Sequence, residues 1–240
     1  MAARIESVTV DDGSFDLPLW VPDRGAGPGI IVIQEIFGVG PYIEKVAENL
    51  ADLGYTVGAP DLFWRIERNW NCANDAAGMA EGMRMASQFD FAGGVSDCGA
   101  AVAHMRTLPE VSGGIGTVGF CLGGSLGYVL AAEVEAEGDA RPDVTVAFYG
   151  SRVDSSLDLL ERITSPLLFV YGGSDPFIPR DRVAQVETAA HGRDNVEFHV
   201  AEAAGHAFHN HEAPQLHHPE AAAEAWDLTV NFLARHLPPG

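Results

Sequence analysis

The sequence predicts a single α/β domain in which helices cover both faces of a mostly parallel central sheet. Continuous apolar runs at residues 29–33, 144–149 and 167–171 are typical of strands that are buried on both faces. Segments with helical spacing of apolar residues lie between these runs, and this alternation of strand and helix indicates the fold class. The 240 residues contain no repeat, low-complexity tract or linker, so we expect one domain over residues 1–240.

The expected elements follow in a simple order along the chain. Two alternating runs at residues 5–10 and 16–21 flank the turn-rich segment 11–14, which predicts an N-terminal antiparallel hairpin. Further strands are expected at residues 29–33, 55–59, 144–149, 167–171 and 196–201, with one more leading into Cys121. Helices are expected at residues 41–53, 76–89, 93–107, 180–191 and 221–236, and from Cys121 to about residue 137.

Composition narrows the classes of partner and compartment. Fourteen Lys plus Arg against 34 Asp plus Glu give a net charge of −20, which disfavours nucleic acid and anionic membrane surfaces as partners. The first residues show no signal-peptide pattern and no apolar stretch approaches a membrane span, so we expect a cytoplasmic protein. Cys72, Cys98 and Cys121 form no close-spaced pair, which argues against a disulfide framework or a zinc finger.

The segment 117–124, Thr-Val-Gly-Phe-Cys-Leu-Gly-Gly, predicts a strand, a tight turn and a helix. Cys121 stands at the turn, with Gly119 and Gly123 two positions to either side. With cysteine in place of serine, this pattern matches the nucleophile elbow of α/β-hydrolases. A helix N-terminus favours a thiolate, and its free N–H groups can bind an oxyanion. Cys121 is therefore the candidate nucleophile, and the alternative is an inert cysteine in a packed glycine turn.

Two further residues complete a candidate triad. Asp175 follows the expected strand 167–171 through a pair of glycines, and His206 follows the last expected strand in the same way. In this architecture the nucleophile, the acid and the histidine occur in that order along the chain, each after a strand. Asp175 alone suits a turn residue and His206 alone suits the surface, but their order after Cys121 predicts a Cys-His-Asp triad.

Five segments carry a resemblance to a known family. They are Gln-Glu-Ile-Phe-Gly at 34–38, Ala-Pro-Asp-Leu at 59–62, Gly-Phe-Cys-Leu-Gly-Gly at 119–124, Gly-Gly-Ser-Asp at 172–175 and Gly-His-Ala-Phe at 205–208. With them the chain resembles the dienelactone hydrolases (carboxymethylenebutenolidases) over nearly its whole length. The resemblance implies an α/β-hydrolase fold, cleavage of a lactone or carboxylic ester through an acyl-thioester, a place in aromatic-compound catabolism, and no cofactor.

The resemblance also implies roles for individual residues. Cys121 would be the nucleophile, His206 the base and Asp175 its orienting acid, with Glu35 as a carboxylate beside the thiol and the backbone N–H groups of Ile36 and Leu122 as the oxyanion hole. Glu35 can also be interpreted directly. A carboxylate at the end of a buried strand would favour a protonated resting thiol and could accept its proton when substrate binds. The alternative for Glu35 is a structural salt bridge or cap.

The substrate pocket departs from the family pattern. Family members hold the substrate carboxylate with arginines, and the matching positions here are Asn210 and Met79, while Met83 replaces a pocket tyrosine. We therefore expect the carboxylate clamp to be absent or rebuilt, with Arg65, Arg68 and Arg84 as candidate replacements. The residues expected in the substrate pocket are Phe37, Met79, Met83, Phe208 and Asn210. A less charged, bulkier ester or lactone is the alternative substrate.

Other functions remain open from the sequence. The histidines at 206, 209, 211, 217 and 218 lack the Cys or carboxylate partners of a known ligand set, so we expect no metal. No glycine-rich phosphate cradle follows a strand, so we expect no nucleotide cofactor. We expect a small lactone or ester as the partner and a monomer or weak homodimer. The alternatives from other classes are a non-catalytic ligand-binding member and a redox-sensing thiol protein.

Overall fold

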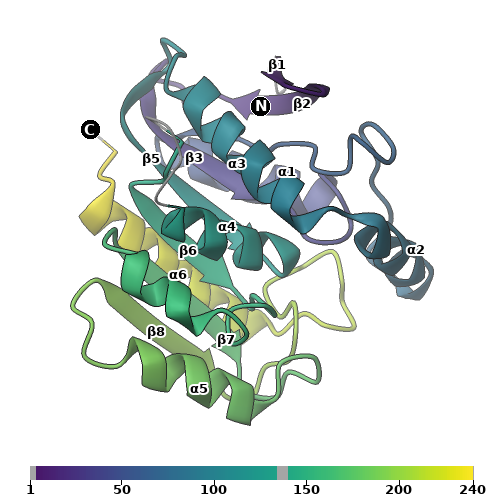
Figure 1. Cartoon of the computed structure of the whole chain (residues 1–240), viewed down its shortest axis with the longest axis vertical. Helices are drawn as coiled ribbons and strands as arrows, with labels where there is room; N and C mark the ends of the chain where they lie inside the picture. The colour runs from purple at the N-terminus through teal and green to yellow at the C-terminus, as the bar shows by residue number, and fades with distance from the viewer. Residues whose placement is uncertain (1–3, 134–139, 240) are drawn as a thin grey trace.

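The computed structural model describes residues 4–133 and 140–239, and these form an α/β fold around an eight-stranded sheet (Figure 1). The strand order is β1-β2-β4-β3-β5-β6-β7-β8. β1 pairs with β2, and β2 with β4, in antiparallel fashion, and every other pair is parallel. The strands are β1 Arg4–Val10, β2 Gly13–Trp20, β3 Gly27–Ile33, β4 Thr56–Gly58, β5 Val111–Phe120, β6 Val144–Phe148, β7 Leu167–Gly172 and β8 Val196–Ala201. The predicted fold class and N-terminal hairpin are confirmed.

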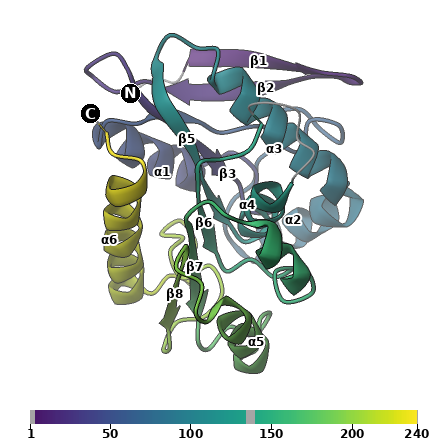
Figure 2. The same cartoon turned by 60° about the vertical axis from the view of Figure 1, so that its left-hand side comes forward.

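Helices cover both faces of this sheet. Figure 2 shows α6 on one side of the strands and α3, α4 and α5 on the other. The helices are α1 Pro41–Asp52, α2 Ala76–Gln88, α3 Phe91–Met105, α4 Leu122–Ala132, α5 Arg180–Ala190 and α6 Pro219–His236, with the 3-10 helix η1 Leu157–Arg162. The part of the expected helix at residues 134–137 lies outside the described residues. Among the helices that the structure describes, none combines the length and apolar character needed to cross a membrane.

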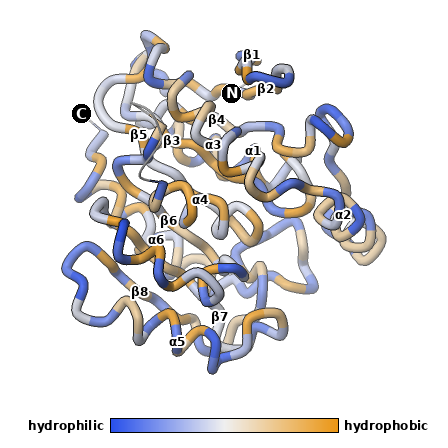
Figure 3. Tube along the Cα trace, in the orientation of Figure 1, coloured by the Kyte–Doolittle hydropathy of each residue, from blue (hydrophilic) through white to orange (hydrophobic). Residues whose placement is uncertain are grey.

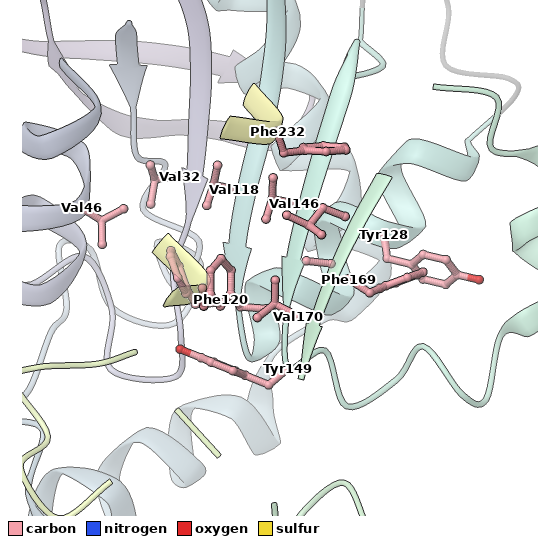
Figure 4. Close-up of a cluster of buried hydrophobic side chains, with 14 of the residues drawn as sticks. Val32, Val46, Val118, Phe120, Tyr128, Val146, Tyr149, Phe169, Val170 and Phe232 are labelled. Atoms are coloured by element: carbon pink, nitrogen blue, oxygen red, sulfur yellow. The ribbon is translucent and has the colours of Figure 1, made fainter. Parts of the chain in front are cut away.

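The core lies between the central strands and the helices. Hydrophobic residues follow the central strands, and hydrophilic residues gather on outer loops (Figure 3). Val32, Val118 and Val146 lie on neighbouring strands in this core, and Phe120 and Phe169 pack near their carboxyl ends (Figure 4). Burial of such side chains contributes about 1.5–3 kcal/mol each, which makes the strand ends a rigid support for the loops that follow them.

Two element starts differ from the sequence prediction for local reasons. β5 begins at Val111, ahead of the apolar run at 117, because its first half pairs with β3 through Gly27 and Val111. α3 begins at Phe91 because the side chain of Asp90 accepts a hydrogen bond from the N–H group of Ala92 and caps the helix. Pairing with β3 therefore makes β5 longer than the apolar spacing predicts, and the Asp90 cap does the same for α3.

Candidate active site

Cys121 occupies a strained turn between β5 and α4. Its backbone has φ 53° and ψ −108°, in a region that residues other than glycine seldom adopt. The turn closes tightly, because a Cβ atom on Gly119 would lie 2.1 Å from the carbonyl oxygen of Gly123. A Cβ atom on Gly123 would lie 2.2 Å from the carbonyl oxygen of Ile33. The two glycines therefore let the chain hold the Cys121 side chain out at the N-terminus of α4, as an elbow requires.

Cys121, His206 and Asp175 form one hydrogen-bonded chain. The Nε2 atom of His206 lies 3.1 Å from the Cys121 sulfur, and its Nδ1 atom lies 2.7 Å from Oδ2 of Asp175. Asp175 in turn accepts hydrogen bonds through Oδ1 from the N–H groups of Phe177 at 2.7 Å and Ile178 at 3.1 Å. These contacts fix the carboxylate, so that Nδ1 of His206 donates to Asp175 and Nε2 faces the sulfur.

Backbone pairing between two loops brings the acid and the histidine together. Asp175 follows β7, and His206 follows β8. The N–H group of Gly173 donates to the carbonyl oxygen of Ala201 at 2.9 Å, and that of Ser174 donates to Ala204 at 2.9 Å. The two loops therefore continue the pairing of β7 with β8 beyond the carboxyl ends of the two strands, and this pairing sets the geometry of the triad.

The surroundings of His206 favour its protonated form. Burial opposes the imidazolium, yet the pKa of His206 stands well above its ordinary value because the Cys121 sulfur and the Asp175 carboxylate both attract the cation. The rings of Tyr149 and Phe177 lie 5.1 and 5.2 Å from the imidazole ring, measured between centroids. An imidazolium held between an acid and a sulfur is the charge state that a thiolate–imidazolium pair requires.

Glu35 is a buried carboxyl group at the end of β3. Its side chain lines the same cavity as Cys121, and the residue is only 2% exposed. Oε2 accepts a hydrogen bond of 2.7 Å from the amide of Asn210. Among the described residues, Oε1 has no hydrogen-bond partner. Burial raises the pKa of Glu35 to about 7, although His206, the Asn210 amide and the nearby Tyr149 hydroxyl each favour the ionised form. Within the described part of the chain, the Tyr149 hydroxyl, like Oε1, makes no hydrogen bond of ordinary geometry. Glu35 can therefore gain or lose a proton near neutral pH.

A cavity of about 270 Å³ opens above the triad. The residues that line it are mostly apolar: Glu35, Ile36, Phe37, Met79, Met83, Ala86, Phe89, Phe91, Cys121, Leu122, Ser125, Ser151, Arg152, Phe177, His206 and Ala207. Phe37, Met79 and Met83 were expected there and do line it. Phe208 and Asn210 were also expected in the substrate pocket, but neither lines this cavity. Both are fully buried behind the cavity, Phe208 against the ring of Tyr149 and Asn210 against Glu35.

None of the three arginines proposed from the sequence lines this cavity. Arg65 pairs with Asp12 and Asp97, Arg84 pairs with Glu81, and Arg68 lies over the ring of Trp64.

Arg152 lines the cavity instead, and sequence reasoning missed it. Its guanidinium lies 4.4 Å from the centre of the Phe91 ring, and none of the carboxylates that the structure describes pairs with it. Arg152 follows β6 by four residues, so the strand-end rule that found Asp175 and His206 could have found it too.

The C-terminal histidines have separate structural roles. His209 Nδ1 lies 2.8 Å from the hydroxyl of Tyr42, and His217 Nδ1 lies 3.0 Å from the carbonyl oxygen of Phe208. His218 caps α6 by accepting from the N–H group of Ala221. Within residues 4–133 and 140–239, no group of three His, Cys, Asp or Glu side chains is placed to hold a metal ion.

Comparison with known proteins places the chain in a family. The family model of the dienelactone hydrolases matches residues 15–237. The chain belongs to the dienelactone hydrolase family. A carboxymethylenebutenolidase of Pseudomonas sp. (strain P51) is 33% identical over 98% of this chain and 97% of its own length. A carboxymethylenebutenolidase of Rhodococcus opacus is 31% identical over 91% of this chain and 85% of its own length.

Solved structures share the fold of this dienelactone hydrolase family member. A Klebsiella pneumoniae protein, described as a candidate dienelactone hydrolase, superposes with a TM-score of 0.80 at 24% identity, covering 97% of this chain and 98% of its own. A dienelactone hydrolase-like promiscuous phosphotriesterase from metagenomic libraries gives a TM-score of 0.76 at 24% identity, over 99% of this chain and 100% of its own. At this level of identity the likeness concerns the fold.

Proposed function

We propose that this member of the dienelactone hydrolase family hydrolyses a lactone or carboxylic ester with Cys121 as the nucleophile. The observation that carries the proposal is the hydrogen-bonded chain from the Cys121 sulfur through His206 to Asp175, with the sulfur lining a cavity. Nucleophile, base and orienting acid in this geometry are the parts that covalent acyl transfer needs.

The acylation half of the reaction uses charges already present in the site. Glu35 takes the proton of the Cys121 thiol as substrate binds, and the sulfur attacks the carbonyl carbon. The tetrahedral intermediate expels the alcohol oxygen, which takes a proton from the imidazolium of His206 and leaves a thioester. In a lactone, this alcohol stays attached to the acyl chain, so the ring opens.

Deacylation returns every group to its starting state. Neutral His206 removes a proton from a water molecule, which attacks the thioester carbonyl and releases the carboxylic acid. The Cys121 thiolate that leaves takes back the proton held on Glu35. In both halves, the oxyanion is proposed to lie against the backbone N–H groups of Leu122 and Ile36. Leu122 is the first residue of α4, so its N–H group has no partner within the helix.

Substitution of Cys121 tests the nucleophile. We expect Cys121→Ala to lower the rate of 4-nitrophenyl acetate hydrolysis by more than about a thousandfold while the thermal unfolding midpoint changes little. His206→Ala should slow deacylation, so that mass spectrometry detects one acetyl group on Cys121. Full activity of Cys121→Ala would refute the assignment. Protection of Cys121 from iodoacetamide by a lactone that is never hydrolysed would favour a ligand-binding protein instead.

Arg152 supports a substrate that carries a carboxylate. The curated relatives are named for a butenolide with a carboxymethylene group, and this chain lacks arginines at the two matching positions. Arg152 is the one arginine or lysine among the described residues that line the cavity. An unpaired guanidinium beside an apolar cavity can bind a carboxylate through two parallel hydrogen bonds.

Kinetics with two matched lactones test this choice of substrate. We expect Arg152→Ala to lower kcat/KM about tenfold for the carboxymethylene lactone, and less than about twofold for its neutral carboxamide analogue. Arg84→Ala removes the same charge from a surface pair with Glu81 and is the control. Equal effects of Arg152→Ala on both lactones would exclude recognition of the carboxylate.

The apolar lining supports a second candidate substrate, a bulkier and less charged ester. Met79, Met83 and Phe89 contribute only apolar surface to the cavity, and methionine side chains adapt to varied shapes. If the wild-type enzyme prefers uncharged aryl esters over the carboxymethylene lactone, this second candidate replaces the first.

A further inference from the structure

We propose that Asn210, oriented by Asn74, is a positioning residue that holds Glu35 by one oxygen and leaves the other free to exchange a proton with Cys121. The inference rests on the proposed function for the role of that proton. The arrangement itself rests on contacts in the buried layer beneath the cavity, and its test does not require turnover.

The amide of Asn210 has only one orientation that satisfies its neighbours. Asn210 is fully buried, and its Nδ2 atom donates to Oε2 of Glu35 at 2.7 Å and to Oδ1 of Asn74 at 2.8 Å. Its Oδ1 atom accepts from the N–H group of Glu212 at 3.0 Å. If the amide were flipped, Oδ1 of Asn210 would face the oxygens of Glu35 and Asn74, and the backbone N–H group of Glu212 would have no acceptor. Asn74 therefore fixes which atom of Asn210 faces Glu35.

Asn74 is itself held in place through its backbone. The side chain of Gln215 donates to the carbonyl oxygen of Asn74 at 2.8 Å. Glu35, Asn74 and Asn210 come from three distant parts of the chain, after β3, before α2 and after β8. The network therefore forms only when folding brings these three segments together.

This arrangement distinguishes the two oxygens of Glu35. Oε2 accepts the amide hydrogen of Asn210, so it serves as an acceptor in both protonation states. The proton of neutral Glu35 consequently resides on Oε1, which is buried and, within the described part of the chain, has no hydrogen-bond partner. Because Glu35 lines the cavity with Cys121, the transfer breaks the S–H bond, leaves the electron pair on sulfur and forms an O–H bond at Oε1.

The neutral charge of Asn210 matters as much as its position. Four other titratable groups lie around the Glu35 carboxyl. His206 and Tyr149 interact with it electrostatically, and Tyr42 and the Cys121 sulfur belong to the same cluster of interacting groups. Burial raises the pKa of Glu35, and the Asn210 hydrogen bond lowers it only in part. A cation at residue 210 would hold the carboxyl ionised, whereas the amide leaves both protonation states accessible near pH 7.

Infrared difference spectroscopy tests the positioning directly. The carbonyl band of protonated Glu35, assigned by its loss in Glu35→Gln, should titrate with a midpoint near pH 7 in the wild-type protein. We expect Asn210→Leu to move this midpoint up by about one pH unit, because a hydrogen bond to the ionised carboxyl is lost. Asn74→Ala removes only the side chain that orients Asn210, so a smaller upward shift is expected.

Asn195→Leu provides the matched control. Asn195 also donates two amide hydrogen bonds, to the carbonyl oxygens of Ile163 and Ser165 at 3.1 and 3.0 Å, and none of these three residues lines the cavity. Its loss should lower stability without moving the Glu35 midpoint. An unchanged midpoint in both Asn210→Leu and Asn74→Ala, with folded protein, would overturn the positioning role.

The pH profile of hydrolysis tests the proton exchange. The acid limb of kcat/KM for 4-nitrophenyl acetate, followed at the isosbestic wavelength of the product, should move with the infrared midpoint in each variant. A limb that stays fixed while the midpoint shifts would overturn the exchange of a proton with Cys121. If the wild-type protein hydrolyses no ester, the proposed function fails, and the infrared titration still decides the role of Asn210.

Discussion

Replacement of Gly119 by alanine is a direct test of the elbow. A Cβ atom at this position would lie 2.1 Å from the Gly123 carbonyl oxygen, 2.4 Å from the Gly123 carbonyl carbon and 2.8 Å from the Gly124 nitrogen. Ordinary contact begins at 3.4 Å, so the first of these is short by 3.4 − 2.1 = 1.3 Å. All three neighbours are backbone atoms, and no side chain can rotate away to relieve the overlap.

The expected cost follows from this overlap. Forcing a methyl group into closed packing destabilises a protein by about 1–3 kcal/mol. Opening the turn by about 1 Å also displaces the Cys121 sulfur from His206, and a displacement of that size reduces rates by about a hundredfold. We therefore expect Gly119→Ala to lower both the free energy of unfolding and kcat.

Gly127 supplies the control from the helix that follows the elbow. A Cβ atom there would meet its nearest neighbours at 3.5, 3.5 and 3.7 Å, which is ordinary contact. Gly127 lies inside α4, where alanine is favoured over glycine by about 0.5–1 kcal/mol. Urea unfolding and initial rates with 4-nitrophenyl acetate would compare the two variants. A Gly119→Ala protein with wild-type kcat would refute the close approach of Gly119 and Gly123 as the support of the nucleophile.

Three further outcomes are expected. Asp175→Asn should lower kcat by about 10³–10⁴-fold with little loss of stability, because the new amide would donate to Nδ1 and force the wrong tautomer on His206, and steady-state rates would check this. Glu35→Gln should stabilise the protein by about 3 kcal/mol at pH 8 and hardly at all at pH 4, as urea unfolding at both pH values would measure. Folding raises the pKa of Glu35 from 4.5 to about 7, so the free-energy cost of ionising Glu35 in the folded protein grows as the pH rises from 4.5 to 7. Arg65→Ala should destabilise by about 2 kcal/mol, because it leaves the buried Asp97 carboxylate without its cation, while kcat/KM stays unchanged; an altered substrate preference would show that Arg65 reaches the cavity after all.

Much of the fold was predictable because the pattern of burial is simple. β3 and β6 are buried along their whole length, so each appears in the sequence as an unbroken apolar run. The first half of β5 was missed because residues 111–114 include two glycines and a serine, which disfavour a strand locally. Pairing with β3 stabilises this segment as a strand although its residues have low strand propensity. Boundaries fixed by tertiary contacts are therefore the part that a single sequence conceals.

The candidate site shows the same division between residues that chain order predicts and residues whose place depends on tertiary contacts. Cys121, Asp175 and His206 were found from chain order and strand ends, and the structure brings them into hydrogen-bond contact. Their catalytic roles remain predictions. Asn210 was expected in the substrate pocket, because family alignment preserves position along the chain but not the length of the side chain. The short amide reaches Glu35 and stops there, in a fully buried layer.

The charges of Arg152 and Glu35 modify, inside the cavity, the effect of the negative charge of the whole protein. A net charge of −20 repels an anionic substrate at long range, but salt screens such repulsion beyond about 8 Å at physiological ionic strength. In the proposed function, Arg152 acts at contact distance, where screening is weak, and so decides whether a carboxylate is accepted once it arrives. An ionised Glu35 would add a second negative charge to that cavity. Because Asn210 contributes a hydrogen bond and no charge, Glu35 can be neutral when the Cys121 thiolate forms, and the cavity then carries one fewer negative charge during attack.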